Sequence, residues 1–113
     1  MPMCQSGTYS FANLDRVQTN LTYWDGNVTK YDWTVDSGNV MPGPDNSSMV
    51  MTLSEANMGT KISSTRYVHY GKISSKVKTG KWAGVVTAAI TMSDMKDEID
   101  WVSDIASFTR TVE

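Results

Sequence analysis

The sequence predicts an all-β protein whose strands form an antiparallel sandwich. Two observations support this fold class. From residue 49 onward, apolar residues recur with a period of two, which is typical of strands with one face in water. These strand-like stretches follow one another without a clear helix between them, and such a succession is typical of antiparallel sandwiches. With 113 residues, the chain is long enough for one domain but not for two.

The first part of the chain is rich in Asn, Asp, Gly, Thr and aromatic residues, and only short pieces such as YDWTV at 31–35 look like strands. The segment MPGPDNSS at 41–48 predicts a turn, because two prolines, a glycine and Asx residues leave no room for a helix. The stretch 49–53 then alternates, with methionine or leucine at its odd positions, and predicts a strand.

Two further strands are predicted in the second part of the chain. Along YGKISSKVKT at 70–79, Ile73 and Val77 share one face and the lysines share the other, so this strand has one face in water. The stretch AGVVTAAITM at 83–92 is nearly continuous in apolar residues and predicts a buried central strand. Its even positions form an unbroken apolar face, made of Val86, Ala88, Ile90 and Met92.

Composition excludes several classes of function. The formal net charge is −2 and the ten Lys and Arg residues are scattered, so no basic stripe predicts a nucleic-acid partner. No apolar run approaches the roughly 20 residues that a membrane span needs. The start, MPMCQSG, has neither a basic nor an apolar segment, so no signal peptide is visible. Cys4 is the single cysteine, and we predict no metal site and no cofactor.

Three N-x-[ST] sequons, at Asn20, Asn27 and Asn46, exceed what the content of Asn, Ser and Thr gives by chance. They predict possible N-glycans and favour a secreted surface.

The stretch 93–106 fits two structures. As a helix, it would have Ser93 as its cap and Asp94 in its first turn, with apolar residues at helical spacing. As a strand, it would project Glu98 and Asp100 from the same face, roughly 6.6 Å apart along the chain. Periodicity does not decide between the two.

Residues 59–101 closely resemble glycoside hydrolase family 16, and within it the fungal Crh-type cell-wall transglycosylases. Three pieces carry the resemblance: ISSTRYVHYGK, GVVTAAITMSD and DEIDW. A weaker likeness extends over most of the preceding chain. We therefore divide the chain into residues 1–101, the N-terminal part of a family 16 domain, and residues 102–113, a tail that does not match.

The resemblance implies a concanavalin-like jelly roll whose concave sheet binds a polysaccharide, here β-glucan or chitin, without a cofactor. The family's signature is E-x-D-x-E on a strand that crosses this sheet. By this match, Glu98 is the nucleophile and Asp100 is the middle carboxylate that tunes it. The chemistry explains the residue types, because a retaining glycosidase needs two carboxyl groups about 5–5.5 Å apart around the scissile bond.

The signature breaks at Val102, where the family has its acid/base glutamate. Valine cannot transfer a proton, and the loss of general acid catalysis costs about 10²–10⁴-fold in rate. Asp104 lies one step too far along the strand and has a shorter side chain, so we do not expect it to substitute. The sequence thus predicts an inactive fragment of an extracellular, cell-wall enzyme of fungal type. The alternatives are a non-catalytic carbohydrate-binding sandwich and a truncated product without a stable fold.

The tail VSDIASFTRTVE is predicted to be frayed or to form a short helix, which leaves an apolar face of the sheet incompletely covered. Because the match ends abruptly and Val102-Ser103 can be encoded by GTG AGT, the consensus start of an intron, we interpret the tail as a read-through intron; the alternative is a genuine, diverged terminus. Aromatic platforms for sugars are a further prediction, although core packing explains each candidate more simply: Trp24, Trp33, Trp82 and Trp101.

Overall fold

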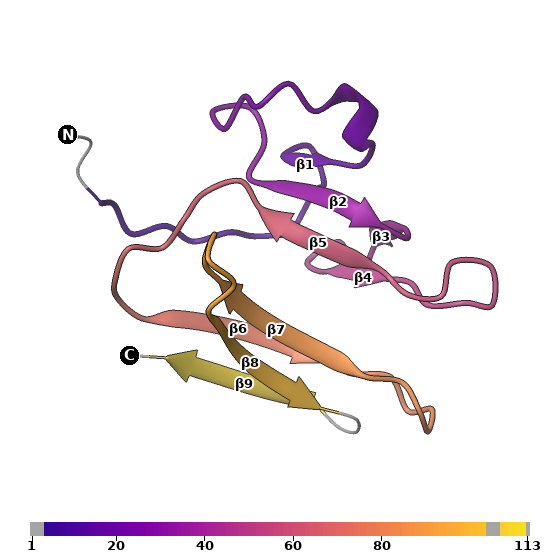
Figure 1. Ribbon diagram of the computed structural model, residues 1–113. Coiled ribbons are helices and arrows are strands. Elements are labelled where there is room, and N and C mark those ends of the chain that lie inside the picture. Colours follow the sequence, from indigo (N-terminus) through magenta and orange to yellow (C-terminus); the bar gives the residue numbers. More distant parts are fainter. Residues whose placement is uncertain (1–3, 104–106, 113) are drawn as a thin grey trace. The chain divides into compact units, whose positions relative to one another are not determined.

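Strands make up nearly all of the regular structure in the computed structural model, which describes residues 4–103 and 107–112, with side chains through residue 102 (Figure 1). The elements are β1 Val17–Gln18, η1 Leu21–Tyr23, β2 Trp33–Ser37, β3 Val40–Pro42, β4 Met49–Met51, β5 Lys61–Ser64, β6 Ile73–Lys78, β7 Thr87–Met92, β8 Glu98–Ser103 and β9 Ser107–Val112. Apart from the short parallel β1–β2 pair, every strand pair among these residues is antiparallel. The predicted all-β, antiparallel fold class is confirmed.

The chain divides into two compact units, Met1–His69 and Tyr70–Glu113. In the first unit, β2 is the middle strand of a three-stranded sheet with the order β1-β2-β5. A register shift between Val35 and Ser37 interrupts the pairing of β2 with β5. The apolar core of this unit is small: among the described residues, only the apolar side chains of Val17 and Val35 are buried.

The first unit also contains the β3–β4 hairpin, in which Pro42 lies opposite Met49. The turn predicted for 41–48 therefore begins two residues later than expected. Pro42 is compatible with the first strand because this hairpin is two-stranded, and a proline on an edge strand removes no inner ladder bond. The Gly43 N–H closes the loop by donating to the Ser48 carbonyl at 2.8 Å.

In the second unit, β6 pairs with β9 and β7 pairs with β8. The predicted alternation in β6 is confirmed, because Ile73 and Val77 are half-buried whereas Lys76 and Lys78 are exposed.

The predicted burial of the stretch 83–92 is wrong. Strand β7 pairs with β8 and, within the described ranges, with no other strand, so it is not a central strand. Its apolar even positions are open to solvent, with 63% of Val86, 51% of Ile90 and 47% of Met92 exposed. A continuous apolar run predicts burial only where other layers cover both faces. Roughly half of each of these side chains is open to solvent, so the expected incompletely covered apolar face is confirmed.

The helical interpretation of 93–106 is also wrong over the described residues. Ser93 does act as a cap, since its Oγ accepts from the Asp97 N–H at 3.1 Å. The capped structure is a tight turn rather than a helix, because the Ser93 N–H donates to the Asp97 carbonyl at 2.8 Å and Lys96 has a φ of 70°. Strand β8 starts directly after this turn.

The tail is neither frayed nor helical where it is described. Strand β8 continues across Val102, and β9 pairs with β6 so that Val112 lies opposite Ile73. Asp104 and the expected short helix around Ile105 lie outside the described residues. No helix in the described ranges has the length and apolar character to cross a membrane.

Candidate active site

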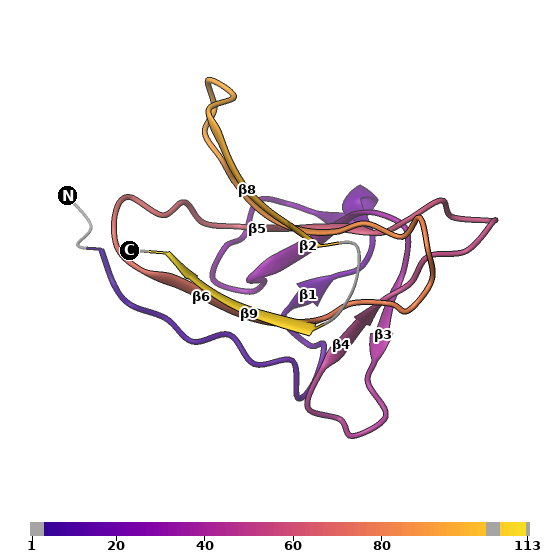
Figure 2. The same ribbon diagram turned by 90° about the horizontal axis from the view of Figure 1, so that it is seen from below.

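The two carboxylates of the signature lie on one face of β8. Glu98 and Asp100 alternate along the strand, and Ile99 and Trp101 take the opposite face. In the register with β7, Met92 lies opposite Glu98. Strand β8 pairs with β7 in a two-stranded antiparallel hairpin, which is seen from below in Figure 2. The strand prediction, which rested on resemblance rather than periodicity, is confirmed.

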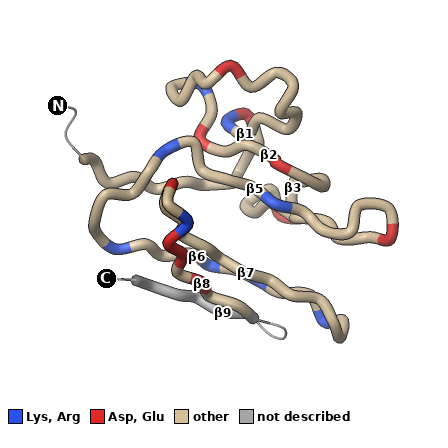
Figure 3. Tube along the Cα trace, in the orientation of Figure 1, with Lys and Arg blue, Asp and Glu red and all other residues tan. Residues whose placement is uncertain are grey.

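The carboxyl groups of Glu98 and Asp100 interact directly. A hydrogen bond to Asp100 raises the pKa of Glu98 above its ordinary value, and loss of hydration and repulsion by the Asp100 charge act in the same direction. Acidic residues gather in the turn before β8 and along its first half (Figure 3). Both side chains are exposed, so the pair can accept or share a proton with a molecule in solution.

The third position of this face is Val102, which lies opposite Ala88 and is 62% exposed. A valine offers no proton and no lone pair. The face therefore supplies two adjacent carboxyl groups but not the acid that would protonate a leaving group.

The site has an apolar border that sequence reasoning missed. Residues directly opposite each other on paired strands share a face. Ala88, Ile90 and Met92 therefore lie on the same face as the carboxylates rather than in a core. The signal was present in the sequence, because the even positions of 83–92 and the signature positions of β8 come into register once the turn at 93–97 is recognised.

The tryptophans divide between the units. Trp101 lies opposite Ala89 and is half-buried on the face of β8 that points away from the carboxylates, whereas Trp82 is 78% exposed. Trp24 and Trp33 belong to the first unit, where each contacts a tyrosine ring. Their tyrosine contacts fit the packing explanation.

A second acidic site, in the first unit, was not predicted. Asp32 accepts two hydrogen bonds from Arg16, at 2.6 and 2.9 Å, and one from Arg66 at 2.6 Å. These guanidinium groups lower the pKa of Asp32 to about 2, the hydrogen bond from Arg16 being the largest cause. The two arginines are 16 and 34 residues away from Asp32 in sequence, so no local sequence pattern predicts the cluster.

Comparison with known proteins assigns the chain to a family. The model of glycosyl hydrolases family 16 matches residues 27–112, a range that includes β8 and runs past Trp101. Crh-like protein 2 of Aspergillus fumigatus is 42% identical over 101 residues, which are 88% of this chain and 22% of the relative. Crh-like protein 3 of Botryotinia fuckeliana is 36% identical over 88% of this chain and 22% of its own length.

Congo red hypersensitive protein 2 of Saccharomyces cerevisiae is 37% identical over 89% of this chain and 21% of its own length. The chain thus spans roughly a fifth of the length of the curated relatives it matches. No solved structure matches the chain.

Proposed function

The chain belongs to glycosyl hydrolase family 16, and we propose that it is part of a retaining enzyme that hydrolyses or transfers β-linked cell-wall polysaccharide, with β-glucan or chitin as the substrate. The observation that carries this proposal is the pair Glu98 and Asp100, whose side chains share one face of β8 inside the matched region. Within the pair, Asp100 raises the pKa of Glu98. The antiparallel all-β architecture fits a part of the jelly-roll sandwich.

In the complete enzyme, the Glu98 carboxylate attacks the anomeric carbon and forms a glycosyl ester, while the bond from that carbon to the leaving oxygen breaks. The leaving oxygen takes its proton from a general acid. Water or a sugar hydroxyl then attacks the ester, loses its proton to the same group as a base, and releases Glu98. Asp100 holds and polarises Glu98 through their hydrogen bond.

Val102 decides what the chain itself does. Without an acid at this position, a sugar leaving group departs as an unprotonated alkoxide, and the rate falls by about 10²–10⁴-fold. We therefore expect no measurable turnover of laminarin or chitin oligomers.

Val102 also favours a second candidate function, a carbohydrate-binding sandwich without catalysis. Binding to β-glucan or chitin without turnover would identify it. A third possibility, a product without a stable fold, would lack cooperative thermal unfolding.

A substrate that needs no acid tests the role of Glu98. A dinitrophenyl β-glycoside carries a leaving group that departs without protonation, so the ester on Glu98 should accumulate and appear by peptide mass spectrometry. Glu98→Gln should abolish the adduct. Asp97→Asn, which changes a neighbouring acid just before β8, is the matched control and should retain it. Labelling of another residue, or robust hydrolysis of unmodified polysaccharide, would contradict the proposal.

The proposed location is the extracellular space and the cell wall, with N-glycans at the three sequons. All three asparagines are exposed, as Asn20, Asn27 and Asn46 each lie in a turn or cap. In Asn20 and Asn27 the amide oxygen accepts a hydrogen bond from a backbone N–H. A glycan attaches to the amide nitrogen, so these hydrogen bonds do not occupy the atom that would be glycosylated. Expression through a secretory pathway, followed by a glycan-removing endoglycosidase, should increase the electrophoretic mobility of the chain.

The division after Trp101 rests on the signature, which departs from E-x-D-x-E at Val102, while the family match continues to residue 112. Genomic DNA beyond codon 101 tests the proposed intron. A GT-initiated segment that ends in AG, followed by a frame opening with Glu and an aromatic residue, is the expected result; an uninterrupted coding frame contradicts it.

A further inference from the structure

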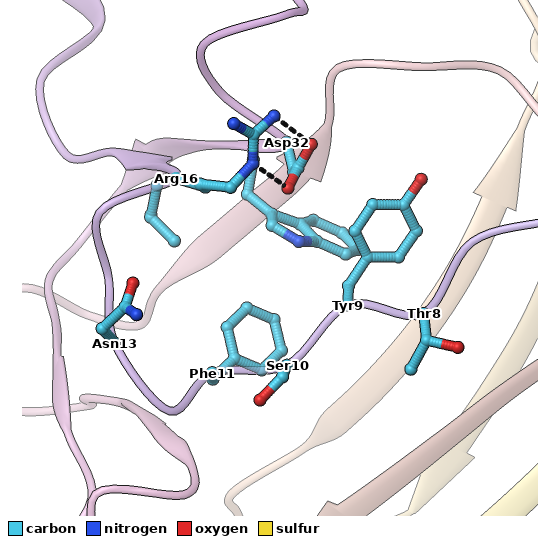
Figure 4. Close-up of a pocket in the computed structure, with 9 residues that line it drawn as sticks. Thr8, Tyr9, Ser10, Phe11, Asn13, Arg16 and Asp32 are labelled. Carbon is cyan, nitrogen blue, oxygen red and sulfur yellow. Dashed lines mark hydrogen bonds and ion pairs between the residues drawn. The ribbon is translucent and has the colours of Figure 1, made fainter.

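A pocket of about 170 Å³ lies in the first unit (Figure 4). Figure 4 shows the Arg16–Asp32 pair on one side of it and Phe11 and Ser10 on another. Most of the wall comes from the extended N-terminal segment 8–17, and β2 with the residue before it supplies the rest. The lining residues are Thr8, Tyr9, Ser10, Phe11, Asn13, Arg16, Val17, Asp32 and Trp33.

The pocket belongs to a different unit of the chain from the proposed active site. Its N-terminal wall precedes residue 27, where the family match begins, and every lining residue belongs to the unit Met1–His69. The carboxylates of β8 belong to the other unit. The signature residues of β8 therefore take no part in this pocket.

Aromatic rings form the apolar part of the wall. Trp33 contacts Tyr9 edge to face, with ring centroids 5.8 Å apart, and contacts Phe11 at 5.9 Å with the planes tilted by 48°. A T-shaped pair leaves at least one ring face uncovered by its partner. Tyr9 is 47% exposed, so its ring is accessible from solvent. Such faces accept the C–H face of a sugar ring.

The polar part of the wall suits a neutral ligand rather than an anion. The Nε and Nη2 groups of Arg16 already donate to Asp32, and Nη2 also donates to the Thr29 carbonyl. With a pKa of about 2, Asp32 is ionised throughout the physiological range and would repel an anion. Hydroxyl groups of Thr8, Tyr9 and Ser10 and the amide of Asn13 add neutral donors and acceptors.

We propose that this pocket binds one neutral pyranose unit of a glycan, independently of catalysis at β8. The volume lies below the roughly 300–1,000 Å³ of pockets that bind drug-sized ligands, so the pocket suits one ring rather than an oligosaccharide. Aromatic faces beside carboxylate, guanidinium and amide groups match the alternation of C–H faces and equatorial hydroxyls on such a ring. The site would hold a polysaccharide near the chain through one of its residues.

The test is a titration of the whole chain by NMR, following the indole N–H signal of Trp33, which Trp33→Phe identifies by its loss. Laminaritriose and chitotriose are the two probes, and they distinguish a glucose from an N-acetylglucosamine source. At least one should shift the signal saturably, with a dissociation constant of about 1 mM. Sorbitol, which has the hydroxyls but no ring, should leave the signal in place.

Variants then locate the binding. Tyr9→Ala should weaken it by at least about ten-fold. Tyr23→Ala, the matched loss of a tyrosine ring at a 72% exposed position outside the pocket, should leave it unchanged. Tyr9→Phe keeps the ring and should weaken binding less than Tyr9→Ala, and Asn13→Ala serves if Tyr9→Ala does not fold.

Glu98→Gln should bind with the parent affinity, so a failure of the active-site assignment and a failure of the pocket are separate results. The proposal is overturned if neither trisaccharide shifts the Trp33 signal, if sorbitol shifts it equally, or if Tyr9→Ala titrates like the parent chain.

Discussion

The two acidic sites of the molecule have opposite electrostatics. In the first unit, the side chain of Asp32 is only 13% exposed, and its pKa is lowered to about 2. In the second unit, Glu98 is exposed, and its pKa is raised. Burial alone would give Asp32 the higher pKa of the two, because desolvation disfavours the ionised carboxylate. The charge of the nearest partners therefore decides: two guanidinium groups for Asp32, and a second carboxyl group for Glu98.

This difference in pKa distinguishes a carboxylate that stabilises the fold, Asp32, from one that can react with a ligand, Glu98. The ionised Asp32, which directly precedes β2, bonds to Arg16 before β1 and to Arg66 after β5. It thereby connects three segments of the first unit. Its low pKa keeps these bonds through any physiological pH. Glu98 is exposed to ligands, and a second carboxyl group raises its pKa, whereas cations lower that of Asp32.

Loss of Asp32 should be the most destabilising change that distinguishes the sites. Asp32→Asn removes the negative charge between two partly exposed guanidinium groups and leaves some of their N–H groups without an acceptor, and we expect the free energy of unfolding to fall by about 2 kcal/mol. Denaturation in urea measures it. Asp15→Asn, at an exposed acid in the same unit, is the control and should change stability by less than about 0.5 kcal/mol. Equal effects of the two substitutions would contradict a structural role for Asp32.

A pair of truncations should reveal the difference in packing between the units. Val35 is 5% exposed and Ile90 is 51% exposed. Val35→Ala should lower the free energy of unfolding by about 2 kcal/mol, because it leaves a cavity in the small core. Ile90→Ala removes more carbon atoms but leaves no cavity, so we expect a loss below about 1 kcal/mol. A larger loss at Ile90 would mean that this face is covered in solution.

Acid should weaken the first unit through Asp32. Because the folded pKa lies below the ordinary value of 3.8, the ion pairs contribute fully above about pH 5 and are lost as the pH falls towards 2. The pKa shift corresponds to about 2 kcal/mol before screening, and partial exposure of both arginines reduces this to about 1 kcal/mol. Urea denaturation at pH 6 and pH 2 measures the loss, which Asp32→Asn should abolish.

Much of the fold could be predicted from the sequence because it is local. The alternation of Ile73 and Val77 with lysines identifies β6 without any tertiary information. The place of β8 could not be predicted from periodicity, because the Ser93 cap that starts a helix also closes the turn before a strand. Resemblance to a family decided that alternative correctly.

Burial and long-range contacts could not be predicted in the same way. Whether Ile90 is buried depends on layers outside its own strand, which the sequence of 83–92 does not encode. The bonds of Asp32 to Arg16 and Arg66 span 16 and 34 residues, and no motif relates these positions. Glu98 and Asp100 were found only because their signature is a local pattern on one strand.

The smallest expected effect isolates the interaction within the carboxylate pair. Asp100→Asn removes the second carboxyl group and its repulsion, and an amide N–H can donate to the Glu98 carboxylate. The pKa of Glu98 should therefore fall towards or below its ordinary value of 4.5. A ¹³C NMR titration of the Glu98 carboxyl carbon measures it, with Asp97→Asn as the control that leaves the raised pKa in place.

The same shift has a consequence for stability whose sign is opposite to that of Asp32. A raised folded pKa means that the folded chain binds the proton more tightly than the unfolded chain. Stability from Glu98 is therefore present below pH 4.5 and declines as the pH rises through the folded pKa. Asp100→Asn should remove this decline and leave the acid-side loss due to Asp32 intact. If Asp100→Asn leaves the pKa of Glu98 raised, the two carboxyl groups do not act as a pair.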